Sequence, residues 1–152
     1  MNFLFLEIAI GLIVGVMMTV QGILNTALAN RVGVYGSVFI GVVINLILIS
    51  LIILITPKSI SLQNLPGWNK WYLYLGGVLG IFILTSIIII LPRLGATQGF
   101  IYIISGQLIA SVIVDHYGLL GIEKTPINIT KFAGILFFIL GAYLVTISKI
   151  KV

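Results

Sequence analysis

The sequence predicts an all-α polytopic membrane protein with five transmembrane helices, on the basis of its composition, its hydropathy and the length of its apolar segments. Of the 152 residues, 61% are hydrophobic and 7% are charged, and the mean hydropathy is +1.30. A soluble domain is about one quarter charged, so a chain this apolar needs lipid as the solvent for most of its surface. Short breaks with turn formers or charges separate the apolar segments.

Each segment can cross a bilayer as a helix, because about 20 residues that rise about 1.5 Å each span a hydrocarbon core of about 30 Å. We expect a single transmembrane domain over residues 1–152, with spans at about 3–29, 34–55, 71–91, 94–114 and 127–148. The alternating segments of a membrane barrel, roughly ten residues each, are absent. The first segment lacks a basic start and a small-residue cleavage site, so we expect a span there and not a cleaved signal.

The connections mark where each span begins and ends. Asn30-Arg31-Val32-Gly33 follows the first span, and the polar stretch 56–70 follows the second. The third span begins in an aromatic cluster typical of a membrane interface, which contains Trp68, Trp71, Tyr72 and Tyr74. Residues 115–126 separate the last two spans.

The connection between the third and fourth spans is only Pro92-Arg93. Proline favours an extended residue before it, so we expect Pro92 to end the third helix. Gly95 is expected to let the fourth helix approach closely, which gives a tight helical hairpin. Arg93 then lies at the membrane interface, either as an anchor or as a gate that attracts anions.

The composition argues against several function classes. The net charge of +5 comes from Lys and Arg residues spread singly along the chain, so no basic patch for nucleic acid is present. With no cysteine and one histidine, neither a thiol nucleophile nor a metal site is indicated. Gly76-Gly77-x-x-Gly80 lies in an apolar span without a following lysine, unlike a phosphate loop. We therefore expect no catalytic residues, no metal and no cofactor.

The basic residues give no preferred orientation. Five spans place the termini on opposite sides of the membrane, and each side receives four Lys or Arg residues. Because orientation follows the Lys/Arg excess in short loops, the balance predicts insertion in both directions. Two oppositely inserted copies can form an antiparallel dimer that resembles the inverted repeats of secondary transporters. The alternatives are that one dominant charge, which a simple count misses, determines the direction, or that a partner protein does.

Small and polar residues mark the faces on which the spans are expected to pack. In the first span, Glu7 and Asn25 lie on the same helical face as a glycine stripe, with Gln21 at its edge. Small residues let helices approach closely in lipid. The predicted packing glycines are Gly11, Gly15 and Gly22 in the first span, Gly41 in the second, and Gly95, Gly99 and Gly106 in the fourth.

Four amide side chains lie within the apolar spans, namely Gln21, Asn25, Asn45 and Gln107. Polar groups in lipid face the bundle interior or a cavity. They are therefore predicted either to contact a bound small-molecule solute or to form hydrogen bonds between helices.

The ionisable residues allow two interpretations each. Glu7 lies about one turn inside the first span, so it either has a coupling role or reaches the membrane surface. Asp115 and His116 end the fourth span, either as a proton relay, since histidine changes charge near neutral pH, or as an exposed interface pair. No acid lies at mid-depth, which argues against a central carboxylate that exchanges protons for a cation.

Four motifs together resemble the YdcZ-type branch of the drug/metabolite transporter superfamily. They are Gln21-Gly22-x-x-Asn25, Leu91-Pro92-Arg93-Leu94-Gly95-Ala96, Ser105-Gly106-Gln107-Leu108 with Ser111, and Asp115-His116-Tyr117-Gly118. The resemblance implies a multi-pass inner-membrane exporter that forms half of a transporter. It also implies that Gln21, Asn25, Gln107, Ser111 and Asp115 matter most, and Ser111 is expected to contact the solute together with the amides. Small multidrug-resistance relatives use a carboxylate deep in the first span, whereas Glu7 lies near its end.

The expected function is therefore secondary transport of a small organic solute. The expected partners are membrane lipid and either an antiparallel copy or a homologous five-span protein, and no nucleic acid is expected. Two alternatives remain open from the sequence: a membrane scaffold that transports nothing, and a flippase for lipids or lipid-linked sugars of the same superfamily.

Overall fold

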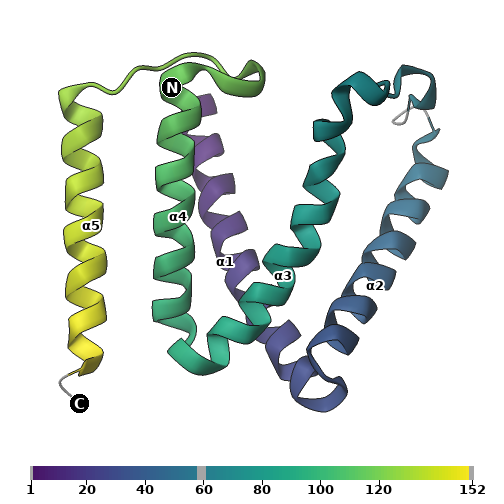
Figure 1. Ribbon diagram of the computed structural model, residues 1–152, viewed down its shortest axis with the longest axis horizontal. Coiled ribbons are helices and arrows are strands. Elements are labelled where there is room, and N and C mark those ends of the chain that lie inside the picture. Colours follow the sequence, from purple (N-terminus) through teal and green to yellow (C-terminus); the bar gives the residue numbers. More distant parts are fainter. Residues whose placement is uncertain (1, 58–60, 151–152) are drawn as a thin grey trace. The chain divides into compact units, whose positions relative to one another are not determined.

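The computed structural model describes residues 2–57 and 61–150, and within these ranges the chain is all-helical (Figure 1). The long helices are α1 (Asn2–Val32), α2 (Val34–Ile55), α3 (Leu75–Leu94), α4 (Ala96–Tyr117) and α5 (Ile129–Ile150). Short 3₁₀ turns η2 (Leu62–Asn64), η3 (Trp68–Tyr74) and η4 (Leu119–Gly121) lie in the connections. All five long helices are apolar and long enough to span a membrane. This confirms the predicted fold class of a polytopic helical membrane protein.

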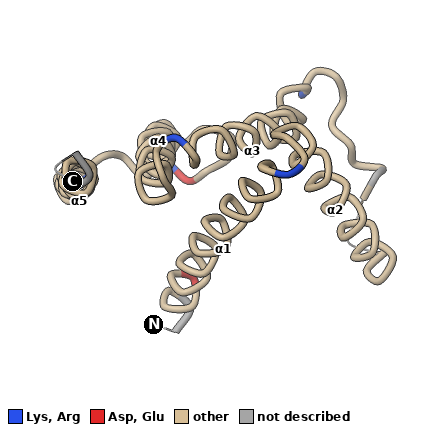
Figure 2. Tube along the Cα trace, turned by 90° about the horizontal axis from the view of Figure 1, so that it is seen from below, with Lys and Arg blue, Asp and Glu red and all other residues tan. Residues whose placement is uncertain are grey.

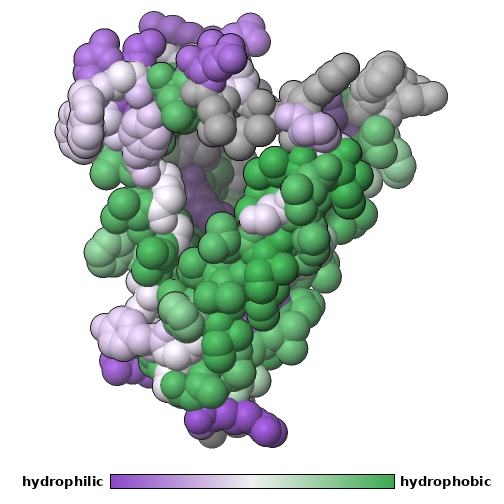
Figure 3. All heavy atoms as spheres, turned by 90° about the vertical axis from the view of Figure 1, so that its right-hand side faces the viewer, coloured by the Kyte–Doolittle hydropathy of each residue, from purple (hydrophilic) through white to green (hydrophobic). Residues whose placement is uncertain are grey.

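The distribution of charge fits a bilayer environment. Among the described residues, Lys, Arg, Asp and Glu lie near the helix ends and in the connections, and the middle of each helix carries none (Figure 2). On the side where α2 and α3 lie, apolar side chains cover a broad band with hydrophilic ones above and below it (Figure 3). Large aliphatic and aromatic side chains are exposed along all five helices. Such a surface is stable only where lipid replaces water.

The third helix differs from expectation at both ends. Pro92 was expected to end the helix, but this prediction is wrong, because α3 continues through Pro92 to Leu94. Proline removes one helical N–H, and membrane helices tolerate that loss where neighbouring groups compensate. At the other end, the aromatic cluster forms the 3₁₀ segment η3, and the α-helix begins only at Leu75. Tyr74 donates a hydrogen bond to the Pro66 carbonyl at 2.8 Å, which holds this connection against the start of α3.

Two glycines make matching junctions between consecutive helices. Gly33 separates α1 from α2 with φ 79° and ψ 163°, and Gly95 separates α3 from α4 with φ 81° and ψ 161°. Each follows an arginine and one aliphatic residue, in Arg31-Val32-Gly33 and Arg93-Leu94-Gly95. This backbone region is essentially restricted to glycine. Gly95 is therefore required by the turn itself, and close approach of the fourth helix is not needed to explain it.

The chain folds as two compact units, Met1–Arg93 and Leu94–Val152. In the first unit, α1 packs against α2 near the Gly33 junction. Ser37 of α2 is fully buried, and its hydroxyl donates to the Asn25 carbonyl of α1 at 2.8 Å. Ile88 of α3 is 2% exposed at the same end of the unit. The three helices are thus packed most closely where α1 ends and α2 begins.

The second unit consists of α4, α5 and the loop between them. Gln98 donates a hydrogen bond from its side-chain amide to the Thr146 carbonyl at 3.3 Å, which links the two helices near one end. At the opposite end the Lys131 ammonium lies 2.7 Å from the Asp115 carboxylate. Gly118, with φ 66°, terminates α4 in the left-handed conformation and reverses the chain.

Candidate functional site

A cavity of about 380 Å³ lies among α1, α2 and α3 of the first unit. Its polar lining consists of Gln21 from α1 and Asn45 from α2. Gly77 and Gly80 of α3 form part of the opposite wall, and apolar side chains such as Leu84 complete it. A hollow is visible in the face shown in Figure 3. The structure therefore brings two of the predicted polar residues to one site.

Helix periodicity explains why Gln21 and Asn45 line the same cavity. Asn45 follows Ser37 by about two turns, so it shares the face of α2 that contacts α1. Gly22 is buried, and Gln21 is its immediate neighbour on α1. A Cβ added at Gly41 of α2 would lie 3.9 Å from the Leu84 side chain of α3, so Leu84 lies next to Gly41 beside the cavity.

The glycines of α3 leave this space unfilled. A Cβ placed on Gly77 or Gly80 would meet no atom within 4 Å. The sequence shows these residues as a glycine-rich run, but it gives no sign that they face the amides of α1 and α2. A glycine carries no chemistry that marks a site, so only the packing of the three helices reveals their position.

Gln21 and Asn45 are both exposed in the single chain, and neither has a hydrogen-bond partner in the part of the chain that the structure describes. Each amide carries one carbonyl acceptor and two N–H donors. In lipid, a polar group without a partner costs several kcal/mol. The cavity thus offers hydrogen-bond donors and acceptors on an otherwise apolar wall, and none of the described residues that line it is charged.

The other predicted polar residues lie elsewhere. Asn25 lines a separate groove along α1 together with Gln21, and its carbonyl accepts the bond from Ser37. Gln107 and Ser111 belong to α4 in the second unit, where both are exposed. The Ser111 hydroxyl donates to the Leu108 carbonyl of its own helix at 2.9 Å. Their predicted contact with a solute stays a prediction.

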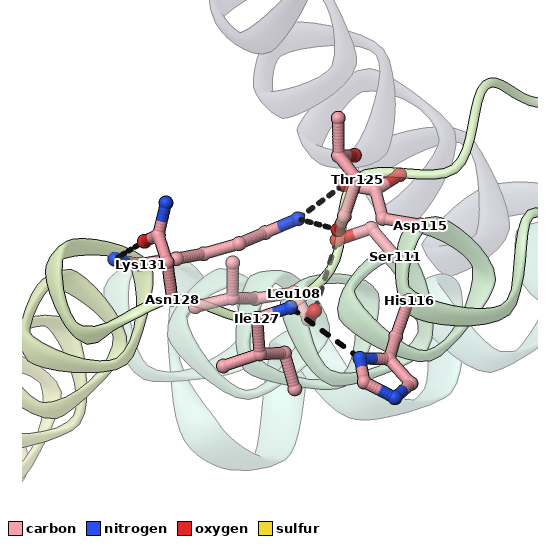
Figure 4. A network of polar contacts seen from close by, with 8 residues as sticks. All are labelled: Leu108, Ser111, Asp115, His116, Thr125, Ile127, Asn128 and Lys131. Carbon is pink, nitrogen blue, oxygen red and sulfur yellow. Dashed lines mark hydrogen bonds and ion pairs between the residues drawn. The ribbon is translucent and has the colours of Figure 1, made fainter.

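Asp115 and His116 are held in a polar network at the end of α4 (Figure 4). Lys131 of α5 reaches the Asp115 carboxylate, and the Thr125 N–H donates to the Asp115 carbonyl at 2.9 Å. On the other side, the Ile127 N–H donates to His116 Nδ1 at 3.3 Å. The two side chains point in different directions in Figure 4, and both hold the loop against α4.

The sequence did not single out Lys131, although it is central to this network. In the sequence it is only one of the eight Lys and Arg residues that enter the charge balance. Its side chain is 27% exposed and that of Asp115 is 33% exposed, so the ion pair is partly shielded from solvent. Asn128 accepts a hydrogen bond from the Lys131 N–H at 2.8 Å and thereby caps the start of α5.

The remaining predicted residues have varied surroundings. Glu7 is exposed near the start of α1, and Arg93 is exposed near the end of α3. Among the predicted packing glycines, Gly22 and Gly99 are buried, whereas an added Cβ at Gly11, Gly15 or Gly106 would meet nothing within 4 Å. In the described ranges, no three His, Cys, Asp or Glu side chains are grouped to hold a metal ion.

Comparison with known proteins adds one match. A family model described as "Putative inner membrane exporter, YdcZ" matches residues 6–144. Neither the curated proteins nor the solved structures contain a significant match to the chain. The family match covers nearly all of α1 to α5 and agrees with five helices of spanning length. The chain therefore belongs to the YdcZ family of inner-membrane exporters of the drug/metabolite transporter type.

Proposed function

We propose that this chain exports a small organic solute and binds it in the cavity among α1, α2 and α3. The observation that carries the proposal is the pair of amides, Gln21 and Asn45, which meet at one cavity without a hydrogen-bond partner among the described residues. A bound solute can supply the missing hydrogen bonds. A cavity of about 380 Å³ is of the size that takes a small ligand.

The lining indicates the kind of solute. Within residues 2–57 and 61–150, no charged side chain lies on the cavity wall. An ion without a partner is strongly disfavoured at membrane depth. Most of the lining is apolar. The cargo we propose is therefore uncharged, with an apolar body and an amide or hydroxyl group that pairs with Gln21 and Asn45.

Transport also requires a second arrangement of helices. We propose that an oppositely inserted copy, or a homologous five-span partner, completes the transporter and permits alternating access. The equal numbers of Lys and Arg on the two sides support this assembly. In the first unit, the helices pack closely near Gly33 and leave the cavity farther along α1, α2 and α3. This arrangement suits a half-transporter whose helices separate and close around the cavity.

The test is uptake from a mixture of metabolites. The purified protein, alone and with any co-expressed homologous partner, is reconstituted into vesicles and exposed to a cell metabolite extract. Solutes that enter are identified by mass spectrometry against protein-free vesicles. We expect uncharged solutes to enter with the protein. If none enters above the protein-free level, transport is overturned; if only ions enter, the proposed cargo class is wrong.

Variants then locate the binding site. Gln21→Leu and Asn45→Leu keep similar side-chain volume and remove the hydrogen-bonding groups. Each is expected to reduce uptake by at least tenfold, the equivalent of about 1.4 kcal/mol. Ser50→Ala is the control on α2, because the Ser50 hydroxyl donates to the Leu46 carbonyl of its own helix and Ser50 does not line the cavity. If both leucine variants fold and transport normally, the cavity is not the site.

A further inference from the structure

A second cavity of about 240 Å³ lies in the first unit, where the ends of α1 and α3 meet the start of α2. Its polar lining is Thr26 and Asn30 from α1 and Arg93 from α3. Ala29, Val34, Ile88, Ile89 and Pro92 form the apolar remainder. Because Arg93 and Asn30 lie at the ends of spanning helices, this cavity is at the depth of the lipid headgroups.

The charge of Arg93 is not neutralised within its unit. Glu7 is the only acid among residues 1–93, and it lies near the opposite end of α1. At about 1.5 Å per residue, it is roughly 35 Å from Asn30. No ion pair to Arg93 is found among the described residues. The Asp115 carboxylate, which belongs to the second unit, pairs with Lys131. The cavity therefore combines an uncompensated cation with a predominantly apolar wall.

The chemistry of the lining selects an anion with an apolar extension. A guanidinium presents paired N–H donors that match phosphate oxygens, and the Asn30 amide supplies further donors. The Thr26 hydroxyl already donates to the Gly22 carbonyl at 2.8 Å, so it is left as an acceptor. The apolar residues suit a glycerol backbone and the first acyl carbons. A free phosphate ion has no apolar part, so its binding is not strengthened by these apolar residues.

We propose that this cavity binds the phosphate of an anionic membrane lipid through Arg93, with Asn30 as a second contact. The site is separate from the solute cavity and does not depend on transport. Arg93 then joins the ends of α1 and α3 through a lipid.

The test uses the purified full-length chain in detergent and native mass spectrometry with added phosphatidylglycerol or phosphatidylcholine. We expect one phosphatidylglycerol to remain bound in preference to phosphatidylcholine. Arg93→Gln is expected to weaken its binding about tenfold, and Asn30→Ala about threefold. Arg31→Gln is the matched control, because it removes the same charge from the same end of the unit but does not line the cavity. It is expected to retain the lipid.

Three outcomes overturn the proposal. One is equal loss of phosphatidylglycerol in Arg93→Gln and Arg31→Gln, which shows a general effect of charge. Another is displacement of the lipid by millimolar inorganic phosphate, which identifies free phosphate as the ligand. The third is unchanged binding in a folded Arg93→Gln protein. If Arg93→Gln does not fold, Arg93→Lys keeps the charge without the guanidinium fork, and undiminished lipid binding by both Arg93→Lys and Asn30→Ala overturns the proposal.

Discussion

Gly33 and Gly95 hold backbone angles that other residues adopt only at a cost of about 1–3 kcal/mol. Each connects two spanning helices without an intervening loop. After each turn, the fourth residue donates its N–H back to the glycine carbonyl at 3.0 Å, in Ser37→Gly33 and Gly99→Gly95. The next helix therefore begins directly at the glycine, and its first turn has a backbone hydrogen bond from the start.

Replacing either glycine by alanine is expected to destabilise the protein. Gly33→Ala and Gly95→Ala should each lower the free energy of unfolding by about 1–3 kcal/mol, because a Cβ is strained at this φ. Thermal unfolding in detergent measures the effect. Gly76→Ala is the control, since Gly76 lies in α3 with an ordinary helical conformation and an added Cβ would enter open space. Equal melting temperatures for all three variants would contradict the backbone explanation.

The sequence reveals polar residues at depth more readily than it reveals backbone requirements. Gln21 and Asn45 are visible as amides in apolar spans, and both prove to line one cavity. The turn conformation of Gly95 was not predicted, because its φ of 81° leaves no trace in the pattern of apolar residues. Lys131 was missed as the partner of Asp115, because that contact depends on how the loop after α4 folds.

At the scale of elements, the Asp115–Lys131 ion pair holds α5 against α4. Asp115→Lys and Lys131→Asp should each destabilise the protein, and the double variant should recover part of the loss by restoring opposite charges. A coupling free energy of about 1 kcal/mol is expected from a double-mutant cycle of detergent unfolding. Zero coupling would show that the pair does not stabilise the helix contact.

A second prediction at the scale of elements concerns Gly77 and Gly80, the two glycines of α3 that line the cavity. Gly80→Leu should fill the cavity beside Gln21 and Asn45, because an added side chain meets open space there. Solute uptake into vesicles should fall at least tenfold with little change in stability. Gly76→Leu is the matched control on the same helix, at a glycine that does not line the cavity. Equal uptake by the two variants would place the solute elsewhere.

The number and order of the helices follow from hydrophobic length alone, since a bilayer requires about 20 apolar residues for each span. Details at the helix ends do not. Pro92 lies two residues before the last residue of its helix, where the loss of one N–H does not stop the last turn. The aromatic cluster before α3 forms the 3₁₀ segment η3, which hydropathy does not distinguish from an α-helix.

For the whole molecule, the balanced charge makes a prediction about insertion. A tag on the C-terminus should be detected on both sides of the membrane, because each side carries four basic residues. Removing one charge should bias the orientation. Lys70→Gln leaves an excess on the C-terminal side and should place the C-terminus in the cytoplasm. Arg31→Gln leaves the excess on the other side and should place the C-terminus outside.

The two substitutions are expected to shift the orientation in opposite directions, which makes the test stringent. A variant that misfolds or inserts poorly would not place the C-terminus on the side opposite to that of the other variant. Accessibility of a C-terminal cysteine to an impermeant reagent, before and after lysis, measures the fraction in each direction. A single orientation in the unaltered chain would mean that an antiparallel assembly needs a separate homologous partner. If neither substitution then moves the C-terminus, loop charge does not determine the orientation, and the charge balance no longer supports a dimer of opposed copies.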